Sequence, residues 1–331
     1  MQAIWSHLWG YWKAIFAIII IANQAINTPA KADNEGKSTV QAAQTTGRVA
    51  VAAATAETDK KFCTAMVPHL PNVSQALCRQ AALLDSGVRS VKGVQLLTRD
   101  VQGEAEVESQ TTRGKLRVLV IGGIHGDELS SAAVALHWIG LAKQLPADVH
   151  WRFIPVLNPD GLMAKPAKRV NANGVDLNRN FPTPFWERDA KVYWEKRTGK
   201  DPRRWPGLKP LSEPETQFLF NEMTRFKPNL IDSIHAPYGV LDFDGPTVPP
   251  SKLGRLYLDQ VGIFPGSLGN YGGVHKGMPV VTIELPSALR TPLDSEMRQM
   301  WLDLLRWMSE RIKPEDEPKI VPVKAKAVKK G

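Results

Sequence analysis

Cysteine is scarce in this sequence, in which Cys63 and Cys78 are the only two among 331 residues. Their spacing is not the Cys-x-x-Cys of many zinc sites, and no histidine stands beside either of them. Zinc ligation by this pair, or two buried free thiols, therefore has no support. A disulfide is the remaining interpretation, and it depends on the compartment in which the chain works.

Clustered positive charge is missing as well, although the formal net charge is +9. The segment 313–331 holds six lysines against three acidic residues, so +3 of the total belongs to this segment. The other basic residues are scattered and form no stripe of the kind that binds nucleic acid. The charge distribution therefore predicts no nucleic-acid partner.

The sequence also lacks an apolar run long enough to cross a membrane comfortably. The best candidate, residues 14–22, becomes long enough only if residues 9–12 are included. A lysine precedes this run, and Ala30-Lys31-Ala32 has the small-x-small pattern of a cleavage site. Residues 1–32 are therefore interpreted as an export signal, either cleaved or kept as a membrane anchor. Both alternatives place the body in the periplasm or another extracytoplasmic compartment, where the two cysteines are expected to pair.

Composition divides the chain into five segments, and no internal repeat is visible. The predicted segments are an export signal (1–32), a flexible spacer (33–60), a disulfide-braced helical prefix (61–90), a catalytic domain (91–312) and a disordered tail rich in lysine and proline (313–331).

The predicted catalytic domain alternates strand-like and helix-like segments. Short apolar runs predict strands at 116–121, 149–157, 230–234 and 279–285. Helices are predicted at 213–226, 252–261 and 293–312. This alternation predicts an α/β fold, in which helices cover both faces of a mixed sheet.

The strand 116–121 leads directly into Gly-Gly-Ile-His-Gly-Asp-Glu. His125 and Glu128 stand where this strand turns into a helix, an edge at which α/β proteins often build their sites. An imidazole and a carboxylate three positions apart can hold one cation, and zinc suits mixed nitrogen and oxygen ligands. The alternative is a polar helix cap, in which the acidic residues only favour the helix dipole.

Two later strands carry further reactive side chains. His235 follows the strand 230–234 and can supply a third zinc ligand, leaving the fourth position for water. Glu284 lies in Pro-Val-Val-Thr-Ile-Glu-Leu-Pro, where a buried carboxylate needs a partner or a function. Near zinc-bound water it would act as a general base. The alternatives are a structural histidine and a salt bridge from Glu284 to an arginine.

The most distinctive run is Arg169-Val-Asn-Ala-Asn-Gly-Val-Asp-Leu-Asn-Arg-Asn-Phe-Pro. It belongs to an irregular region, residues 162–212, and a loop of this length inside a compact domain is usually functional. Arg179 suits bidentate capture of a carboxylate, and Asn178 adds amide donors beside it. Arg169 could stabilise a developing oxyanion. The alternative, a solvated loop, does not explain so many asparagines and arginines among apolar residues.

Taken in this order, the motifs resemble those of the zinc carboxypeptidase family, and within it the bacterial murein peptide amidase branch. The resemblance covers about residues 90–310 and rests on His-Gly-Asp-Glu, Gly-Val-Asp-Leu-Asn-Arg-Asn-Phe-Pro, a strand-end His and Thr-Ile-Glu-Leu-Pro. It implies a mixed, mostly parallel eight-stranded sheet flanked by helices, and one zinc ion per chain. The roles it implies are zinc ligation by His125, Glu128 and His235, base catalysis by Glu284, oxyanion stabilisation by Arg169, and carboxylate binding by Asn178 and Arg179.

One departure from the family pattern concerns a mobile tyrosine. Larger digestive members place such a residue well upstream of the catalytic glutamate, and no residue here aligns with it clearly. Tyr271 is one candidate, because flanking glycines would let its ring swing. Tyr238, shortly after His235, is the other. The alternative for both is a packing role.

These observations predict an exported zinc metallopeptidase that acts on peptidoglycan stem peptides. The bond would be the amide between the γ-carboxyl of D-glutamate and diaminopimelate, or a nearby terminal bond. The succinylglutamate desuccinylase and aspartoacylase branch, which cleaves N-acyl amino acids, is one alternative, but its members are typically cytoplasmic. A non-catalytic cell-wall binding module is the alternative from another class. Nothing in the sequence indicates an oligomeric state.

Overall fold

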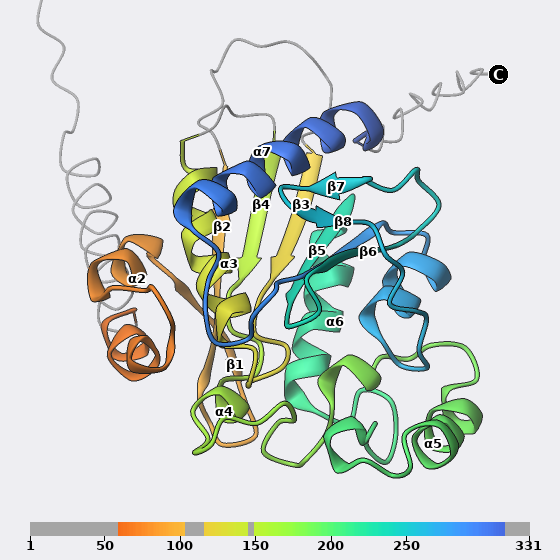
Figure 1. Cartoon of the computed structure of the whole chain (residues 1–331). Coiled ribbons are helices and arrows are strands. Elements are labelled where there is room, and N and C mark those ends of the chain that lie inside the picture. Colours follow the sequence, from red (N-terminus) through yellow and green to blue (C-terminus); the bar gives the residue numbers. More distant parts are fainter. Residues whose placement is uncertain (1–58, 103–115, 145–148, 315–331) are drawn as a thin grey trace, which may run out of the picture. The chain divides into compact units, whose positions relative to one another are not determined.

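The computed structural model describes residues 59–102, 116–144 and 149–314 of the chain (Figure 1). The predicted export signal lies outside these ranges, as do almost all of the predicted spacer and of the predicted tail. None of the helices in the described ranges is long and apolar enough to cross a membrane.

A seven-stranded sheet forms the centre of the fold, with the strand order β1-β2-β4-β3-β5-β9-β6. The strands are β1 (Leu84–Arg89), β2 (Gln95–Val101), β3 (Leu116–Ile121), β4 (Val149–Ile154), β5 (Leu230–His235), β6 (Val240–Asp244) and β9 (Val280–Glu284). The four central strands β4, β3, β5 and β9 are parallel, whereas β1, β2 and β6 pair antiparallel with their neighbours. The predicted mixed α/β sheet is confirmed, although the described residues contribute seven strands to it, not eight.

The predicted helix at 252–261 is wrong. Two short strands, β7 (Lys252–Leu253) and β8 (Leu256–Tyr257), form a small separate sheet there. Gly254 lies between them with a φ of 59°, a left-handed conformation that turns the chain and ends any helix. The segment buries little more than Leu253 and Leu256, which is too narrow a stripe to hold a helix against the core.

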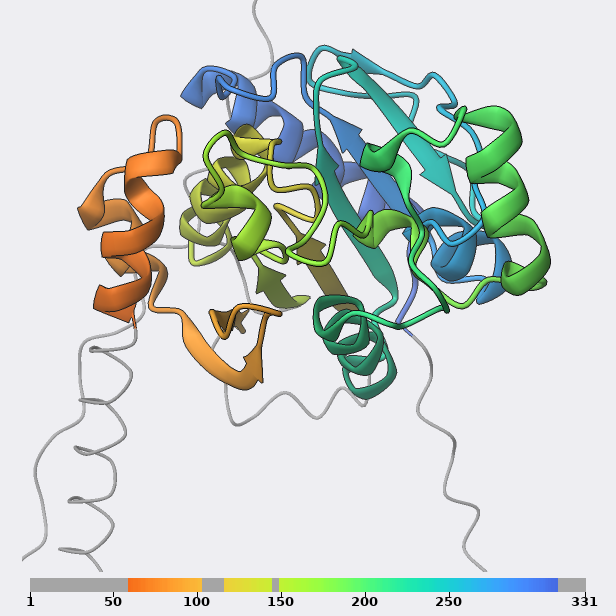
Figure 2. The same ribbon diagram turned by 90° about the horizontal axis from the view of Figure 1, so that it is seen from below.

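β3 shows how the central strands are buried on both faces. Val118 and Val120 pack in one hydrophobic core, and Leu119 and Ile121 pack in a second core on the opposite face. Alternate residues of a parallel strand meet different helical layers, so the strand reads as one continuous apolar run. Figures 1 and 2 show helices on both sides of the sheet. The first core contains residues of α3 (Leu129–Ala142) and α7 (Asp294–Arg311), and the second contains residues of α6 (Pro214–Phe226).

Three buried tryptophans hold α3 and α7 against the sheet. The ring centroid of Trp138 on α3 lies 5.1 Å from that of Trp301 on α7, which lies 4.5 Å from that of Trp151 on β4. Each is at most 2% exposed. Because a buried aromatic ring removes roughly 150–250 Å² of surface from water, this cluster contributes strongly to the stability of the layer.

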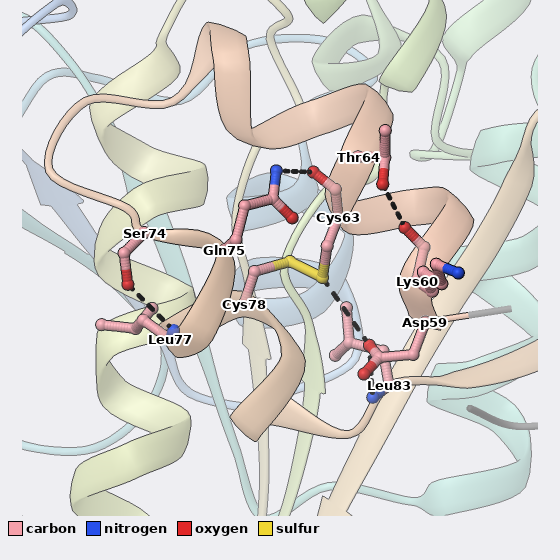
Figure 3. The surroundings of a disulfide bond; sticks show 9 residues. All are labelled: Asp59, Lys60, Cys63, Thr64, Ser74, Gln75, Leu77, Cys78 and Leu83. Carbon is pink, nitrogen blue, oxygen red and sulfur yellow. Dashed lines mark hydrogen bonds between the residues drawn. A yellow bond between two sulfur atoms is a disulfide. The ribbon is translucent and has the colours of Figure 1, made fainter. Parts of the chain in front are cut away.

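The N-terminal prefix is part of the same core. Residues 59–66 are helical, and α2 (Gln75–Ala81) follows them. A disulfide between Cys63 and Cys78 joins these two helices, as predicted, and the Gln75 side chain donates a hydrogen bond to the Cys63 carbonyl (Figure 3). Phe62 packs in the core that contains α3. The predicted helical prefix therefore ends at α2, since the following strand β1 already belongs to the sheet.

The predicted irregular region 162–212 contains more helix than its sequence suggests. Its elements are η2 (Leu177–Arg179), α5 (Trp186–Arg197) and η3 (Pro202–Arg204), and the short helix α4 (Pro159–Leu162) runs into it. Buried Trp186 and Ala190 attach α5 to the body, whereas its other face is charged. The region follows β4, one of the parallel strands, so it starts at their carboxyl edge.

Candidate active site

The reactive side chains meet at the carboxyl edge of the parallel strands. His235 and Glu284 are the last residues of β5 and β9, and they stand opposite each other in register. His125 lies in the loop that leads from β3, the other neighbour of β5, into α3. Crevices at this edge are the usual place for sites in open α/β sheets.

The side chains of His125, Glu128 and His235 converge on one point. His125 Nδ1 lies 2.8 Å from Glu128 Oε1, His235 Nδ1 lies 3.1 Å from Glu128 Oε2, and the two Nδ1 atoms are 3.2 Å apart. All three side chains are at most 5% exposed. Two imidazole nitrogens that face each other beside a carboxylate must share either a proton or a cation, and these ligand atoms lie close enough to hold a metal ion. Two nitrogens and one oxygen suit zinc and leave its fourth position open.

Each histidine is oriented by a hydrogen bond from its other ring nitrogen. His125 Nε2 lies 3.1 Å from Asp176 Oδ1, and His235 Nε2 lies 3.0 Å from Ser233 Oγ. Such outer partners fix the ring so that Nδ1 faces the metal. Burial acts to raise the pKa of Asp176, but the nearby Arg169 guanidinium and the His125 ring hold that pKa well below its usual range. Asp176 therefore stays charged.

Sequence reasoning missed both of these outer residues. Asp176 is the only acidic residue in the distinctive run that begins at Arg169. A single carboxylate among so many asparagines and arginines was the one feature of the sequence that could have marked it as functional. Ser233 precedes His235 by two positions on a strand, so the two side chains share a face. Nothing else in the sequence distinguishes Ser233 from other buried serines.

The loop before α3 can form only because Gly126 has no side chain. A Cβ atom on this residue would lie 2.3 Å from the backbone of Gly161 and Leu162, at the end of α4. The Gly126 N–H donates to the carbonyl of Arg169, which also accepts from the Asn158 side chain. The loop is thereby packed and hydrogen-bonded from outside, which fixes the spacing of its two metal-binding side chains.

Glu128 stands at the N-cap position of α3 without acting as a cap. Its side chain makes no capping hydrogen bond within the described residues, and it faces the two histidines and Arg169 instead. Arg169 Nη1 lies 3.3 Å from Glu128 Oε1, and Arg169 Nε lies 3.1 Å from Asp176 Oδ2. These contacts place the Arg169 guanidinium beside the metal site, so the polar-cap interpretation is not supported.

A single cavity adjoins all of these groups, and we call it the active-site cavity. Its lining includes the three convergent side chains together with Arg169, Asn178, Arg179, Tyr238 and Glu284. Arg179 is only 4% exposed, and its Nε has no acceptor among the described residues. Burial lowers the pKa of Arg179 to about 10, so the guanidinium still carries its charge at neutral pH. A buried cation with a free donor is suited to an anionic group of a ligand.

Asn178 is tied to the far wall of the cavity. Its Oδ1 accepts a hydrogen bond from the backbone N–H of Leu268, and Phe264 lies under the guanidinium of Arg179 at 4.4 Å. Both contacts join the distinctive run to the segment that precedes β9. They hold the two predicted carboxylate-binding residues in place. Arg179 Nη1 donates to the Asn178 carbonyl, whereas Arg179 Nε has no acceptor among the described residues.

Glu284 is 7% exposed and has no neutralising ion pair among the described residues. The backbone N–H of Tyr238 donates to its carboxylate, while Oε2 has no partner in the described part of the chain. Burial raises the pKa of Glu284 above its usual value, and the nearby Glu128 carboxylate adds to the increase. A carboxylate with one free oxygen and a raised pKa is fitted to take up and release a proton.

The two candidate tyrosines lie in different places. Tyr238 lines the active-site cavity and is 57% exposed. Tyr271 is 7% exposed, and its ring packs against Phe181 and Phe220 at centroid distances of 5.9 and 5.8 Å. It lines a separate cavity beside Pro279, at the amino end of β9 and thus at the opposite edge of the sheet. The structure therefore does not bring Tyr271 to the site, and packing accounts for it.

Comparisons with known proteins agree with this geometry. Residues 75–241 match the family model for zinc carboxypeptidase. The chain is 32% identical to murein peptide amidase A of Escherichia coli strain K12 over 196 residues, which cover 57% of this chain and 79% of that protein. It is 33% identical to murein peptide amidase A of Vibrio campbellii, with 55% and 72% covered.

A solved structure supports the fold alone. Carboxypeptidase A from Helicoverpa armigera superposes with a TM-score of 0.52 at 16% sequence identity, covering 70% of this chain and 69% of that one. An identity this low carries no information about the substrate.

Proposed function

This chain belongs to the zinc carboxypeptidase family and is a zinc metallopeptidase, and on that premise we propose that it hydrolyses peptidoglycan stem peptides. The proposed bond is the amide between the γ-carboxyl of D-glutamate and diaminopimelate. Similarity to two murein peptide amidases supports the substrate class. The observation that carries the proposal is the site itself, where three convergent side chains that could hold a metal, the carboxylate of Glu284 and a buried guanidinium with an unpaired Nε share one cavity.

The residues of the triad would hold one zinc ion per chain. When bound, zinc acts as a Lewis acid that polarises the scissile carbonyl and acidifies a bound water. His125 and His235 would coordinate through Nδ1, because their Nε2 atoms are engaged by Asp176 and Ser233. Glu128 would supply the oxygen ligand.

Glu284 would act as the proton carrier. It removes a proton from the attacking water as the water oxygen bonds to the carbonyl carbon, and it delivers a proton to the departing nitrogen as the carbon–nitrogen bond breaks. The products are a carboxylate and a free amine. Its burial matters because a raised pKa makes the carboxylate a stronger base toward the attacking water, whereas at low pH the group is already protonated and cannot accept that proton.

Arg169 and Arg179 would bind opposite ends of the reacting group. Nη2 of Arg169 has no acceptor among the described residues and can donate to the carbonyl oxygen as negative charge builds on it. Arg179, with Asn178 beside it, would hold the carboxylate next to the scissile amide. Because Arg179 is buried, few water molecules would compete with that carboxylate for the guanidinium.

We propose that the enzyme works outside the cytoplasm, in the periplasm, either released or anchored by its N-terminal segment. The disulfide between Cys63 and Cys78 supports this location, since such bonds persist in oxidising compartments. The predicted export signal is a second, independent reason.

Mass spectrometry of purified muropeptides incubated with the zinc-loaded protein tests the proposal. We expect release of diaminopimelate, or of a peptide that begins with it, and loss of that release when a zinc chelator is present. The Glu284→Gln variant should bind zinc at the wild-type ratio and release nothing. If the wild-type protein holds one zinc and cleaves no muropeptide, the proposed substrate is wrong, and N-acyl amino acids become the next substrates to test.

A further inference from the structure

Two acidic residues extend the active-site cavity along strand β6. β6 pairs antiparallel with β9, so that Val240 stands opposite Glu284, Asp242 opposite Thr282, and Asp244 opposite Val280. Side chains two apart on a strand share a face, which puts both aspartates on the face of Glu284. Each step of two residues advances about 7 Å, so they lie one and two steps from the level of the catalytic carboxylate.

Both aspartates line the active-site cavity. Asp242 is 7% exposed, and its Oδ1 accepts a hydrogen bond from the N–H of Phe243. The side chain of Asp244 makes no hydrogen bond or ion pair within the described ranges, and burial together with Asp242 raises the pKa of Asp244 to about 6. The two residues therefore bring carboxylates into the cavity that form no ion pair with a basic side chain among the described residues, although backbone N–H groups of Phe243 and Val261 donate to Asp242.

The packing around Asp244 leaves room for its carboxylate. A Cβ atom on Gly269 would lie 1.9 Å from Asp244 Oδ2, and one on Gly273 would lie 2.4 Å from the Asp244 Cβ. Gly273 would be required by any residue at position 244, because its Cβ would also lie 2.4 Å from the Asp244 carbonyl oxygen. Gly269, in contrast, leaves room for the carboxylate itself, which a small apolar residue at 244 would not need.

Positive charge occupies another part of the same cavity. Arg169, Arg179 and Arg204 line it together with the metal-binding side chains. Arg179 indicates a ligand in this cavity independently of the two aspartates, because it is 96% buried and its Nε has no acceptor among the described residues. A molecule that complements this cavity has a carboxylate near the reacting bond and a cationic group farther along its side chain.

We propose that Asp242 and Asp244 select the substrate by binding the distal ammonium group of diaminopimelate. The inference rests on the proposed function, since it assigns a side-chain subsite to the residue that leaves with the amine. With its carboxylate held by Arg179, that residue would direct its side chain along β6. The distal amino group then lies beside two carboxylates, and a side chain without it leaves them desolvated and unpaired.

Two synthetic tripeptides test this subsite with the zinc-loaded full chain. One is L-alanyl-γ-D-glutamyl-meso-diaminopimelate, and the other carries L-2-aminopimelate, which has the same carbon chain and both carboxylates but no distal amino group. For the wild-type enzyme we expect kcat/KM to be at least about tenfold higher for the first peptide. This comparison needs no variant, so a folding defect cannot obscure it.

The variants Asp242→Asn and Asp244→Asn locate the selectivity. Each replaces a carboxylate by an amide of the same shape, and we expect the ratio of the two kcat/KM values to fall severalfold in each and to approach one in the double variant. Asp294→Asn, at the exposed first residue of α7, is the matched control and should keep the wild-type ratio. A ratio unchanged in the double variant would overturn the assignment.

The outcomes separate this inference from the function on which it rests. Equal cleavage of both tripeptides by the wild-type enzyme would overturn the subsite and leave the proposed function standing. Cleavage of neither, by protein that holds zinc, would overturn the proposed function and the subsite with it. A wild-type preference that disappears in the variants supports both.

Discussion

Asp176 Oδ1 lies 3.1 Å from His125 Nε2, although 51 residues separate them in the chain. The same carboxylate accepts a hydrogen bond from Arg169 Nε through Oδ2 and one from the backbone N–H of Asn178 through Oδ1. One fully buried side chain thus connects the proposed metal ligand His125, the proposed oxyanion donor Arg169 and the turn at Asn178. Because it contacts all three groups, Asp176 fixes their positions relative to one another.

Replacing Asp176 with Asn should weaken zinc binding about 10–100-fold. The amide keeps the size of the side chain but removes the charge that holds the His125 ring and the Arg169 guanidinium. Competition with a chromophoric chelator measures the zinc dissociation constant directly. Asp294→Asn is the control for a surface aspartate, and a wild-type zinc affinity in Asp176→Asn would contradict the assigned role.

The decrease of kcat/KM at acidic pH should reflect protonation of Glu284. The base works only when deprotonated, and burial raises its pKa, so activity should fall as pH drops through a value above that of an ordinary glutamate. The profile must be measured with zinc content checked at each pH, because protonation of the histidines also releases metal. An acidic limb at the pKa of a free glutamate, with zinc fully bound, would show that another group carries the proton.

Asp232 should make the protein less stable as the pH rises. It lies on β5, 0% exposed, with no hydrogen-bond partner for either oxygen among the described residues, and burial raises its pKa to about 8. The folded state then binds this proton more tightly than the unfolded state does. Stability from this group is therefore fully present below about pH 4 and falls by up to about 1.4 kcal/mol per unit until about pH 8.

Chemical denaturation of Asp232→Asn at several pH values measures this effect. The variant cannot titrate at this position, so the difference in unfolding free energy between variant and wild type should move in favour of the variant between pH 4 and 8. A difference that stays constant with pH would mean that Asp232 has a partner or an ordinary pKa in the folded state.

Reducing the disulfide should lower the unfolding free energy by about 3 kcal/mol, the chain-entropy value for a loop of this length. The bond joins residues 15 positions apart, and both cysteines are 0% exposed. Denaturation with and without a reductant, repeated on a Cys63→Ser, Cys78→Ser double variant, separates the covalent effect from changes in packing. Equal stability of the oxidised and reduced forms would show that the noncovalent contacts of the prefix suffice.

The convergence of the proposed metal-binding residues and of Glu284 was predictable because each is marked by local sequence. His125 and Glu128 follow a continuous apolar strand and a pair of glycines, and His235 and Glu284 end two further apolar strands. Strand ends of a parallel sheet meet at one edge, so recognising the strands was enough to bring these residues together. The central strands and the helices α6 and α7 were predictable for the same reason, since burial on one or both faces leaves a periodic pattern.

What the sequence did not reveal depends on contacts between distant segments. The partnership of Asp176 with His125 is set by how a long loop folds back, and no period or spacing encodes it. The proposed subsite residues Asp242 and Asp244 can be placed beside Glu284 only through the register of β6 on β9. Tyr271 was misplaced because flanking glycines suggested mobility, whereas in the structure Gly272 and Gly273 allow close packing against Val280 and Asp244.

The position of β6 in the sheet has a consequence for how enzymes of this kind diverge. Among the described strands of the seven-stranded sheet, β6 is the last, and β9 is its one neighbour in that sheet, apart from an isolated bridge between Leu241 and Leu258. The proposed metal ligands, in contrast, come from β5 and from the loop that follows β3. Substitutions at the margin of the sheet disturb few neighbours. New substrate preferences can therefore arise in evolution by exchanging residues of one border strand, with the hydrolytic apparatus inherited intact.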